Sequence, residues 1–247
     1  MARMAPRDME MGYTAAQAMQ SDQRNFVRKV YGTVAVQLGL TALIASPIAT
    51  ASPAWLQSYG PGLSALSLVL SLVLLFVGCC ARGGLSNVMR SYPTNIALLG
   101  AFTCAESIMV GLVCTAYEVQ SVLLCLALTF GAVGALTAWA VTTDIDTTKW
   151  GQHLVAACMG LSIAGIVAMF VGSPMLNTLY ATGGALVFAG FLVYDTQLII
   201  GNKHESNHRF QIDDYAFAAL MIYMDIVRMF IYLLRLLGED RRGGRRR

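Results

Sequence analysis

The sequence predicts an all-α membrane protein built as a bundle of seven transmembrane helices. Hydrophobic residues make up 56% of the 247 residues and charged residues only 13%, whereas an ordinary soluble domain has about a quarter charged residues. The mean hydropathy is +0.59. Apolar runs long enough to cross a bilayer recur along the chain, and such a run satisfies its own backbone hydrogen bonds only as a helix. The composition therefore indicates an integral membrane protein rather than a soluble domain.

Seven apolar runs, separated by charged or turn-forming residues, are the expected helices. Small residues within them, such as Gly131 and Gly134, would let neighbouring helices approach closely. Together the runs occupy a single domain, residues 30–238. They cover residues 30–50, 63–81, 93–116, 121–141, 151–171, 176–200 and 215–237.

A tail is expected at each end of this domain. Residues 1–29 are polar and have no apolar segment after a basic start, so they predict a flexible cytosolic tail rather than a cleavable signal peptide. Residues 239–247 are rich in arginine and predict attraction to anionic lipid headgroups.

The distribution of lysine and arginine predicts the orientation. One set of connections collects these residues, among them Arg82, Arg90 and Lys149. Because positive connections stay in the cytosol, the N-terminus should be cytosolic. The opposite connections carry neither residue type: residues 51–62, 117–120 and 172–174.

The last run makes this topology ambiguous. Seven full spans place the arginine-rich C-terminal tail on the non-cytosolic side, against the same rule. The run is long enough to cross, although it contains Asp225, Arg228 and Arg235, which leave a partial crossing open. Its length favours seven spans.

No bound cofactor is expected. The six cysteines lie in apolar runs and form neither a disulfide framework nor a zinc pattern. The segment His204-Glu205-Ser206-Asn207-His208 matches the H-E-x-x-H zinc motif, which works when a helix presents both histidines to the metal. Here the segment lies in a polar connection, and the chain has one other histidine, His153. We therefore interpret it as a solvated loop.

Two aspartates inside apolar runs, Asp195 and Asp225, are the main candidates for function. An ionisable residue at membrane depth costs about 2.5 to 3.5 kcal/mol on insertion scales, which indicates a functional site. Intramembrane aspartyl proteases also use two such residues, and Tyr194-Asp195 resembles their Tyr-Asp motif. Their second aspartate follows Gly-x-Gly, however, whereas Asp225 follows Ile222-Tyr223-Met224. Proteolysis is therefore the weaker hypothesis, and we expect no enzyme.

Elementary electrostatics predicts how such a pair behaves. Two carboxylates about 4 Å apart repel by about 4 kcal/mol at an effective dielectric constant of about 20. We therefore expect Asp195 and Asp225 to share one proton and to titrate as a pair. Loss of that proton would attract Ca²⁺, which prefers oxygen ligands. Two carboxylates make an incomplete calcium cage, which suits conduction better than storage.

Other charged residues have two interpretations each. Glu106, inside the third run, is either on an ion path or hydrogen-bonded for packing. Asp213 and Asp214 either cap the last helix or collect cations at a cytosolic mouth. Arg228 lies three residues after Asp225, so both can occupy one helix face. Pairing of the two would make the aspartates part of a triad, or would merely lock the last helix in place.

The C-terminal third resembles the Bax-inhibitor family, also called the transmembrane Bax inhibitor motif or lifeguard proteins. Upstream, Arg24, Phe26 to Tyr31 and Gln37-Leu38 resemble the entry of eukaryotic members into their first span. The resemblance covers about residues 24–238. Its motifs are Tyr194-Asp195-Thr196-Gln197-Leu198-Ile199-Ile200-Gly201, Asp213-Asp214-Tyr215, Tyr223-Met224-Asp225-Ile226 and Leu233-Leu234-Arg235-Leu236-Leu237-Gly238.

This resemblance implies a protein that lets calcium leak from intracellular stores in a pH-dependent way and suppresses cell death. It implies that Asp195 and Asp225 form the proton-sharing gate and contact the permeant Ca²⁺. It also implies a basic residue coupled to them at the cytosolic end of the second helix, for which Arg90 is the candidate, Arg82 the runner-up and Arg228 a substitute. The implied location is the endoplasmic reticulum or Golgi.

The expected partners are the lipid bilayer and calcium ions, and no nucleic acid. A second hypothesis is a non-conducting membrane regulator that binds cell-death proteins or other channels. A generic seven-helix receptor is disfavoured because the loops are short and no Asp-Arg-Tyr motif occurs.

Overall fold

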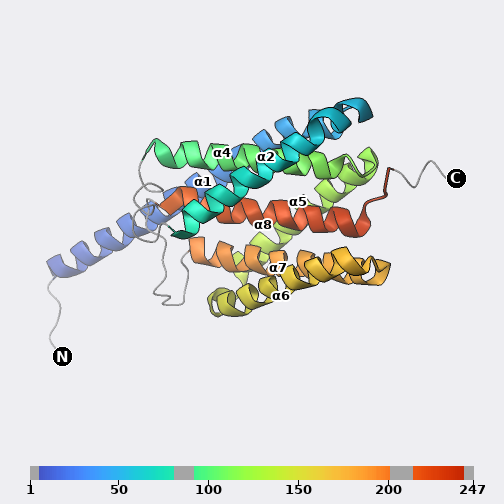
Figure 1. Cartoon of the computed structure of the whole chain (residues 1–247). Helices are drawn as coiled ribbons and strands as arrows, with labels where there is room; N and C mark the ends of the chain where they lie inside the picture. The colour runs from blue at the N-terminus through green and yellow to red at the C-terminus, as the bar shows by residue number, and fades with distance from the viewer. Residues whose placement is uncertain (1–5, 81–91, 201–213, 242–247) are drawn as a thin grey trace.

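The computed structural model of this protein describes residues 6–80, 92–200 and 214–241 (Figure 1). Over these residues the chain is a bundle of long helices, and seven of them are long and apolar enough to cross a membrane. The predicted fold class is confirmed. The helices are α1 (Pro6–Ala49), α2 (Pro53–Cys80), α4 (Thr94–Cys114), α5 (Val119–Thr142), the short 3₁₀ helix η1 (Thr147–Trp150), α6 (Gly151–Val171), α7 (Pro174–Ile200) and α8 (Tyr215–Leu237).

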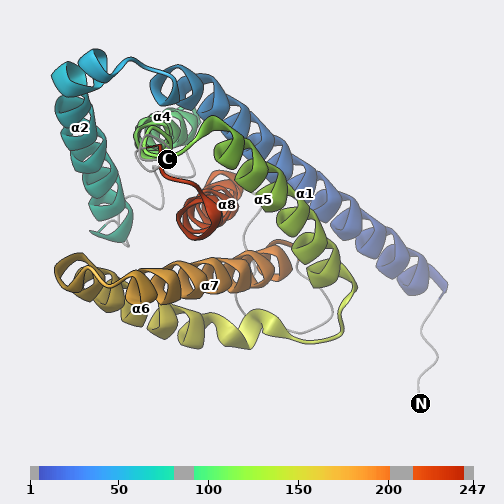
Figure 2. The ribbon, with the colours of Figure 1, turned by 90° about the vertical axis from the view of Figure 1, so that its right-hand side faces the viewer.

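Helix α8 lies at the centre of the bundle. It packs against α1, α4, α5 and α7, and Figure 2 shows it surrounded by its neighbours. It is the most enclosed of the seven spans, whereas α6, at the periphery, is the least enclosed. Its alanines Ala218 and Ala219 are fully buried, which allows close helix packing. Asp225, in the middle of α8, therefore faces other helices rather than lipid.

Glycines allow two close helix contacts. A Cβ on Gly111 of α4 would lie 2.9 Å from Ile48 Cβ of α1, and a Cβ on Gly184 of α7 would overlap the Tyr232 ring of α8. These contacts bring α4 to α1 and α7 to α8; α4, α7 and α8 carry the candidate charged residues Glu106, Asp195 and Asp225.

The turn between α6 and α7 illustrates why helices end where predicted. Gly172 ends α6 with φ of 64°, the left-handed conformation that favours glycine, and Pro174 begins α7. The bounds of α6 and α8 are those predicted.

Two predicted helix starts are too late. Helix α2 begins at Pro53 rather than at residue 63, because proline is tolerated in a first turn and Gly60-Pro61-Gly62 is accommodated within the helix. Helix α1 begins at Pro6, so residues 6–29 continue the first span as helix rather than forming the flexible tail that we predicted. Helix formers around Ala15 and Ala16 favour this continuation. The helix projects beyond the rest of the bundle (Figure 1).

The start of the C-terminal tail is fixed at the end of the bundle opposite the projecting N-terminal arm (Figure 1). Asp240 forms an antiparallel bridge with Tyr117 in the α4–α5 connection. Arg241 donates its backbone N–H to the Ala116 carbonyl (2.9 Å) and its guanidinium to the Ala49 carbonyl at the end of α1 (3.2 Å). Helix α8 therefore traverses the bundle, as seven spans require.

Candidate functional site: a carboxyl pair and a neighbouring ion pair

Asp195 of α7 and Asp225 of α8 lie side by side in the interior. Their residues are 2% and 5% exposed, and their carboxyl groups are close enough to interact with each other. A carboxylate only accepts hydrogen bonds, whereas a protonated carboxyl group also donates one. The two groups can therefore form a hydrogen bond with each other only if at least one of them is protonated.

One oxygen of each carboxyl group has no hydrogen-bond partner among the described residues. These atoms are Oδ1 of Asp195 and Oδ2 of Asp225, and both are buried. A buried polar atom without a partner is costly and calls for an explanation such as a ligand, an ion or a mobile proton.

The residues around Asp195 fix α7 against its neighbours. The Thr196 hydroxyl lies 3.3 Å from the Tyr31 hydroxyl of α1. A Cβ on Gly151 would lie 2.7 Å from the Tyr194 hydroxyl, so glycine at the start of α6 leaves room for that ring. The string that carries the family resemblance therefore serves to position Asp195.

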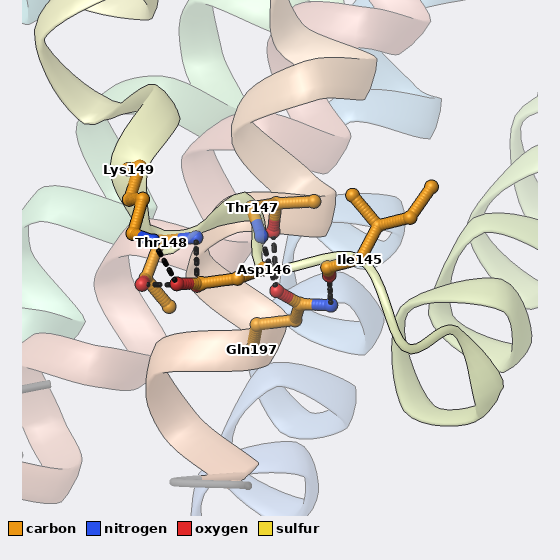
Figure 3. A network of polar contacts seen from close by, with 6 residues as sticks. All are labelled: Ile145, Asp146, Thr147, Thr148, Lys149 and Gln197. Carbon is orange, nitrogen blue, oxygen red and sulfur yellow. Dashed lines mark hydrogen bonds and ion pairs between the residues drawn. The ribbon is translucent and has the colours of Figure 1, made fainter. Parts of the chain in front are cut away.

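Gln197 is a positioning residue that the sequence did not reveal (Figure 3). Its Oε1 accepts hydrogen bonds from the Thr147 N–H (2.9 Å) and hydroxyl (2.6 Å). Its Nε2 donates to the carbonyls of Ala140 (3.2 Å) and Ile145 (3.0 Å). One amide thereby fastens the α5–α6 connection to α7, two residues after Asp195.

Within the same connection, Asp146 stabilises η1. Its Oδ1 accepts hydrogen bonds from the Thr148 N–H (3.1 Å) and hydroxyl, and Lys149 Nζ lies 3.5 Å from its Oδ2 (Figure 3). Asp146 is therefore part of the local fold of the connection.

Arg228 pairs with Glu106, and the pairing with Asp225 that the sequence left open is not the one observed. Arg228 Nη2 donates to Glu106 Oε1 of α4 at 3.1 Å, and the Ser71 hydroxyl of α2 lies 3.4 Å from the same oxygen. The physical reason is that Asp225 is engaged with α7, whereas Arg228, one turn further on, extends toward α4. Glu106 is both hydrogen-bonded and buried inside the bundle.

A chain of buried hydroxyl and amide groups joins α1, α4 and α8 beside the ion pair. Gln37 donates to the Thr103 hydroxyl (2.9 Å), and the Thr41 hydroxyl lies 2.9 Å from the Tyr223 hydroxyl and accepts from Ser107 (3.1 Å). Tyr223 is close enough to Glu106 and Arg228 to interact with both charges. The apolar appearance of the first run concealed this cluster, although Gln37 and Thr41 are spaced one helical turn apart.

The remaining candidates are only partly placed. Arg82, Arg90, Asp213 and the 204–208 segment lie outside the described residues. Asp214 occupies the N-cap position of α8 without a side-chain capping hydrogen bond. Over the described ranges, no group of three or more His, Cys, Asp or Glu residues could hold a metal ion.

Comparisons with known proteins cover nearly the whole chain. The family described as "Inhibitor of apoptosis-promoting Bax1" matches residues 23–242. Protein lifeguard 4 of Mus musculus is 32% identical over 233 residues, 93% of this chain and 91% of the mouse protein. The Golgi anti-apoptotic protein of Vaccinia virus (strain Lister) is 31% identical over 93% of this chain and 92% of its own length. Bax inhibitor 1 of Schizosaccharomyces pombe is 31% identical over 90% of this chain and 79% of its own length.

Proposed function

The chain belongs to the Bax-inhibitor family, and from that premise we propose that it is a proton-regulated calcium leak pathway of an intracellular membrane. Members of this family suppress apoptosis, and its description names that activity rather than a catalysed reaction. The observation that carries the proposal is the close approach of Asp195 and Asp225, two buried carboxyl groups on adjacent membrane-spanning helices.

The shared proton would regulate the pathway. While one proton bridges the carboxyl groups, the pair carries a single negative charge and holds α7 to α8. Removing the proton leaves two carboxylates that repel each other and attract a divalent cation. The buried oxygens without partners, Asp195 Oδ1 and Asp225 Oδ2, would then serve as calcium ligands. We therefore expect leak to rise as pH rises.

Other acidic residues would extend this path. Glu106 supplies a third carboxylate inside the bundle, and Asp214 stands at the start of α8, where with Asp213 it would collect cations at a cytosolic mouth. Arg90 remains a candidate for a basic residue coupled to the pair.

We place the protein in the Golgi or the endoplasmic reticulum with a cytosolic N-terminus. The name of the vaccinia relative refers to the Golgi, and the lysines and arginines favour the N-terminal side as cytosolic. Because α8 traverses the bundle, the arginine-rich tail would then lie in the lumen. Protease protection of epitope tags at the two ends, in sealed microsomes, tests this topology.

Calcium flux into proteoliposomes between about pH 6 and 8 tests the proposal. Asp225→Asn and Asp195→Asn should each lower flux by at least about tenfold, because they remove a charge adjacent to a divalent ion. Asp22→Asn, an exposed position on α1, is the matched control and should leave flux unchanged. The leak proposal fails if Asp225→Asn conducts normally with the wild-type pH dependence while protection from cell death is lost.

One observation favours the second candidate, a non-conducting regulator that binds cell-death proteins or channels. The N-terminal part of α1 continues as helix past the bundle, where it is available for a partner (Figure 1). Deleting residues 1–20 should abolish protection from cell death, and leave flux intact, if that arm provides the function. An unchanged protective effect would remove this support.

A further inference from the structure

We infer that Arg228 determines the ion selectivity of the proposed pathway by neutralising Glu106. This inference rests on the leak function proposed above and adds a specificity-determining residue to it. The two residues lie in the middle parts of α8 and α4, and their side chains form an ion pair of 3.1 Å.

The two charges differ in accessibility. The Glu106 side chain is 3% exposed, whereas that of Arg228 is 35% exposed although α8 is the most enclosed span. An entering ion would therefore meet the guanidinium before the carboxylate. Because charged side chains along a pore select against ions of their own sign, this arrangement opposes cations.

Only one of the two carboxylate oxygens of Glu106 has hydrogen-bond partners among the described residues. Oε1 receives both Arg228 and the Ser71 hydroxyl, while Oε2 is buried without a partner in the described part of the chain. Glu106 thus retains an unused oxygen of the type that binds calcium, beside a cation that cancels its charge.

The ion pair is one helical turn from the aspartate pair. Asp225 and Arg228 are three residues apart on α8, and Asp225 lies beside Asp195. A cation moving along α8 therefore passes a negative pair and then a positive group. Because Coulomb energy scales with ionic charge, Arg228 penalises Ca²⁺ twice as strongly as K⁺.

The ratio of Ca²⁺ to K⁺ flux in proteoliposomes at pH 8 tests this inference. Arg228→Gln should raise the ratio by about tenfold, because one unit charge near a divalent ion is worth at least that factor at an effective dielectric constant of about 20. Glu106→Gln leaves the guanidinium unpaired and should lower the ratio by a similar factor. The Glu106→Gln/Arg228→Gln double variant should return close to wild type.

Arg228→Lys distinguishes a charge effect from a packing effect. Lysine keeps the positive charge and loses the planar guanidinium geometry, so the ratio should stay near wild type even where stability falls. The inference is overturned if Arg228→Lys changes the ratio as Arg228→Gln does, or if Arg228→Gln and Glu106→Gln change it in the same direction. Either result would show that the two residues stabilise the fold without setting the ion selectivity.

The outcomes for the two proposals are separable. A wild-type protein that passes no calcium overturns the leak function and this inference together. Flux that is insensitive to Asp225→Asn contradicts the aspartate gate alone, since the ratio in the Arg228 variants still reports selectivity. If calcium flux falls with Asp225→Asn but the ratio of Ca²⁺ to K⁺ flux is unchanged in the Arg228 and Glu106 variants, only the selectivity role of Arg228 is overturned.

Discussion

Two pairs of charged residues involve positions one turn apart on α8, Asp225 and Arg228, and the pairs are held together by opposite means. Asp195 and Asp225 carry like charges, so their contact depends on a proton. Glu106 and Arg228 carry opposite charges, so their contact needs none. One pair would therefore respond to pH, as proposed above, whereas the other supplies a cross-link between α4 and α8 that needs no proton. The experiments below separate these roles, in order of decreasing effect.

Breaking the ion pair should have the largest effect on stability. Glu106→Gln leaves a guanidinium without its partner inside the bundle, and breaking a buried pair costs about 3 to 5 kcal/mol. We expect about 3 kcal/mol because Arg228 is partly accessible. Asp225→Asn should cost less than about 1 kcal/mol, since the amide can still donate to Asp195. Thermal unfolding in detergent measures both, and equal losses would contradict the comparison.

Forcing α7 away from α8 should affect the aspartate pair selectively. In Gly184→Ala the new methyl group overlaps the Tyr232 ring, and overpacking of this kind costs about 1 to 3 kcal/mol. The pH dependence of calcium flux should shift, while the Glu106–Arg228 coupling in a double-mutant cycle stays the same. Gly131→Ala is the matched control, because a Cβ there has no neighbour within 4 Å. If both variants behave alike, the α7–α8 contact does not govern the pair.

Releasing the α5–α6 connection should have a smaller effect. Gln197→Ala removes four hydrogen bonds and should cost about 2 kcal/mol, the low end of about 0.5 to 1.5 kcal/mol per bond. Hydrogen exchange should increase in residues 140–150 and the pH midpoint of flux should move, since α7 loses an anchor near Asp195. A loss of stability with no change in the pH midpoint would limit Gln197 to the local fold.

The smallest effect on stability is expected at the end of the bundle where Arg241 is fixed. Arg241→Ala removes the hydrogen bond to the Ala49 carbonyl at an exposed site and should cost less than about 1 kcal/mol. Flux and its pH dependence should remain as in wild type. A large change in either would show that the C-terminal segment acts on one of the two pairs.

Much of the fold follows from the sequence, because spans are defined by local polarity. The bounds of α6 and α8 were predicted from the charged and turn-forming residues beside them. The starts of α1 and α2 were missed, since a polar helix carries no hydropathy signal and Pro53 is compatible with a first turn.

The site was predicted less completely, for a physical reason. Asp195 and Asp225 are conspicuous because a lone carboxylate in an apolar run is costly. The partner of Arg228 is 122 residues away in sequence, and spacing along α8 pointed instead to Asp225. The four bonds of Gln197 likewise depend on where the α5–α6 connection folds, which no local pattern encodes.

Infrared spectroscopy of the protonated carboxyl group, recorded as a function of pH in the reconstituted protein, tests the central claim most directly. The account predicts a protonated-carboxyl band near neutral pH that disappears as calcium flux rises. It should be altered in Asp195→Asn and Asp225→Asn and kept in Glu106→Gln. A band that is unaffected in both aspartate variants, or one that is lost in Glu106→Gln, would contradict a proton shared by Asp195 and Asp225.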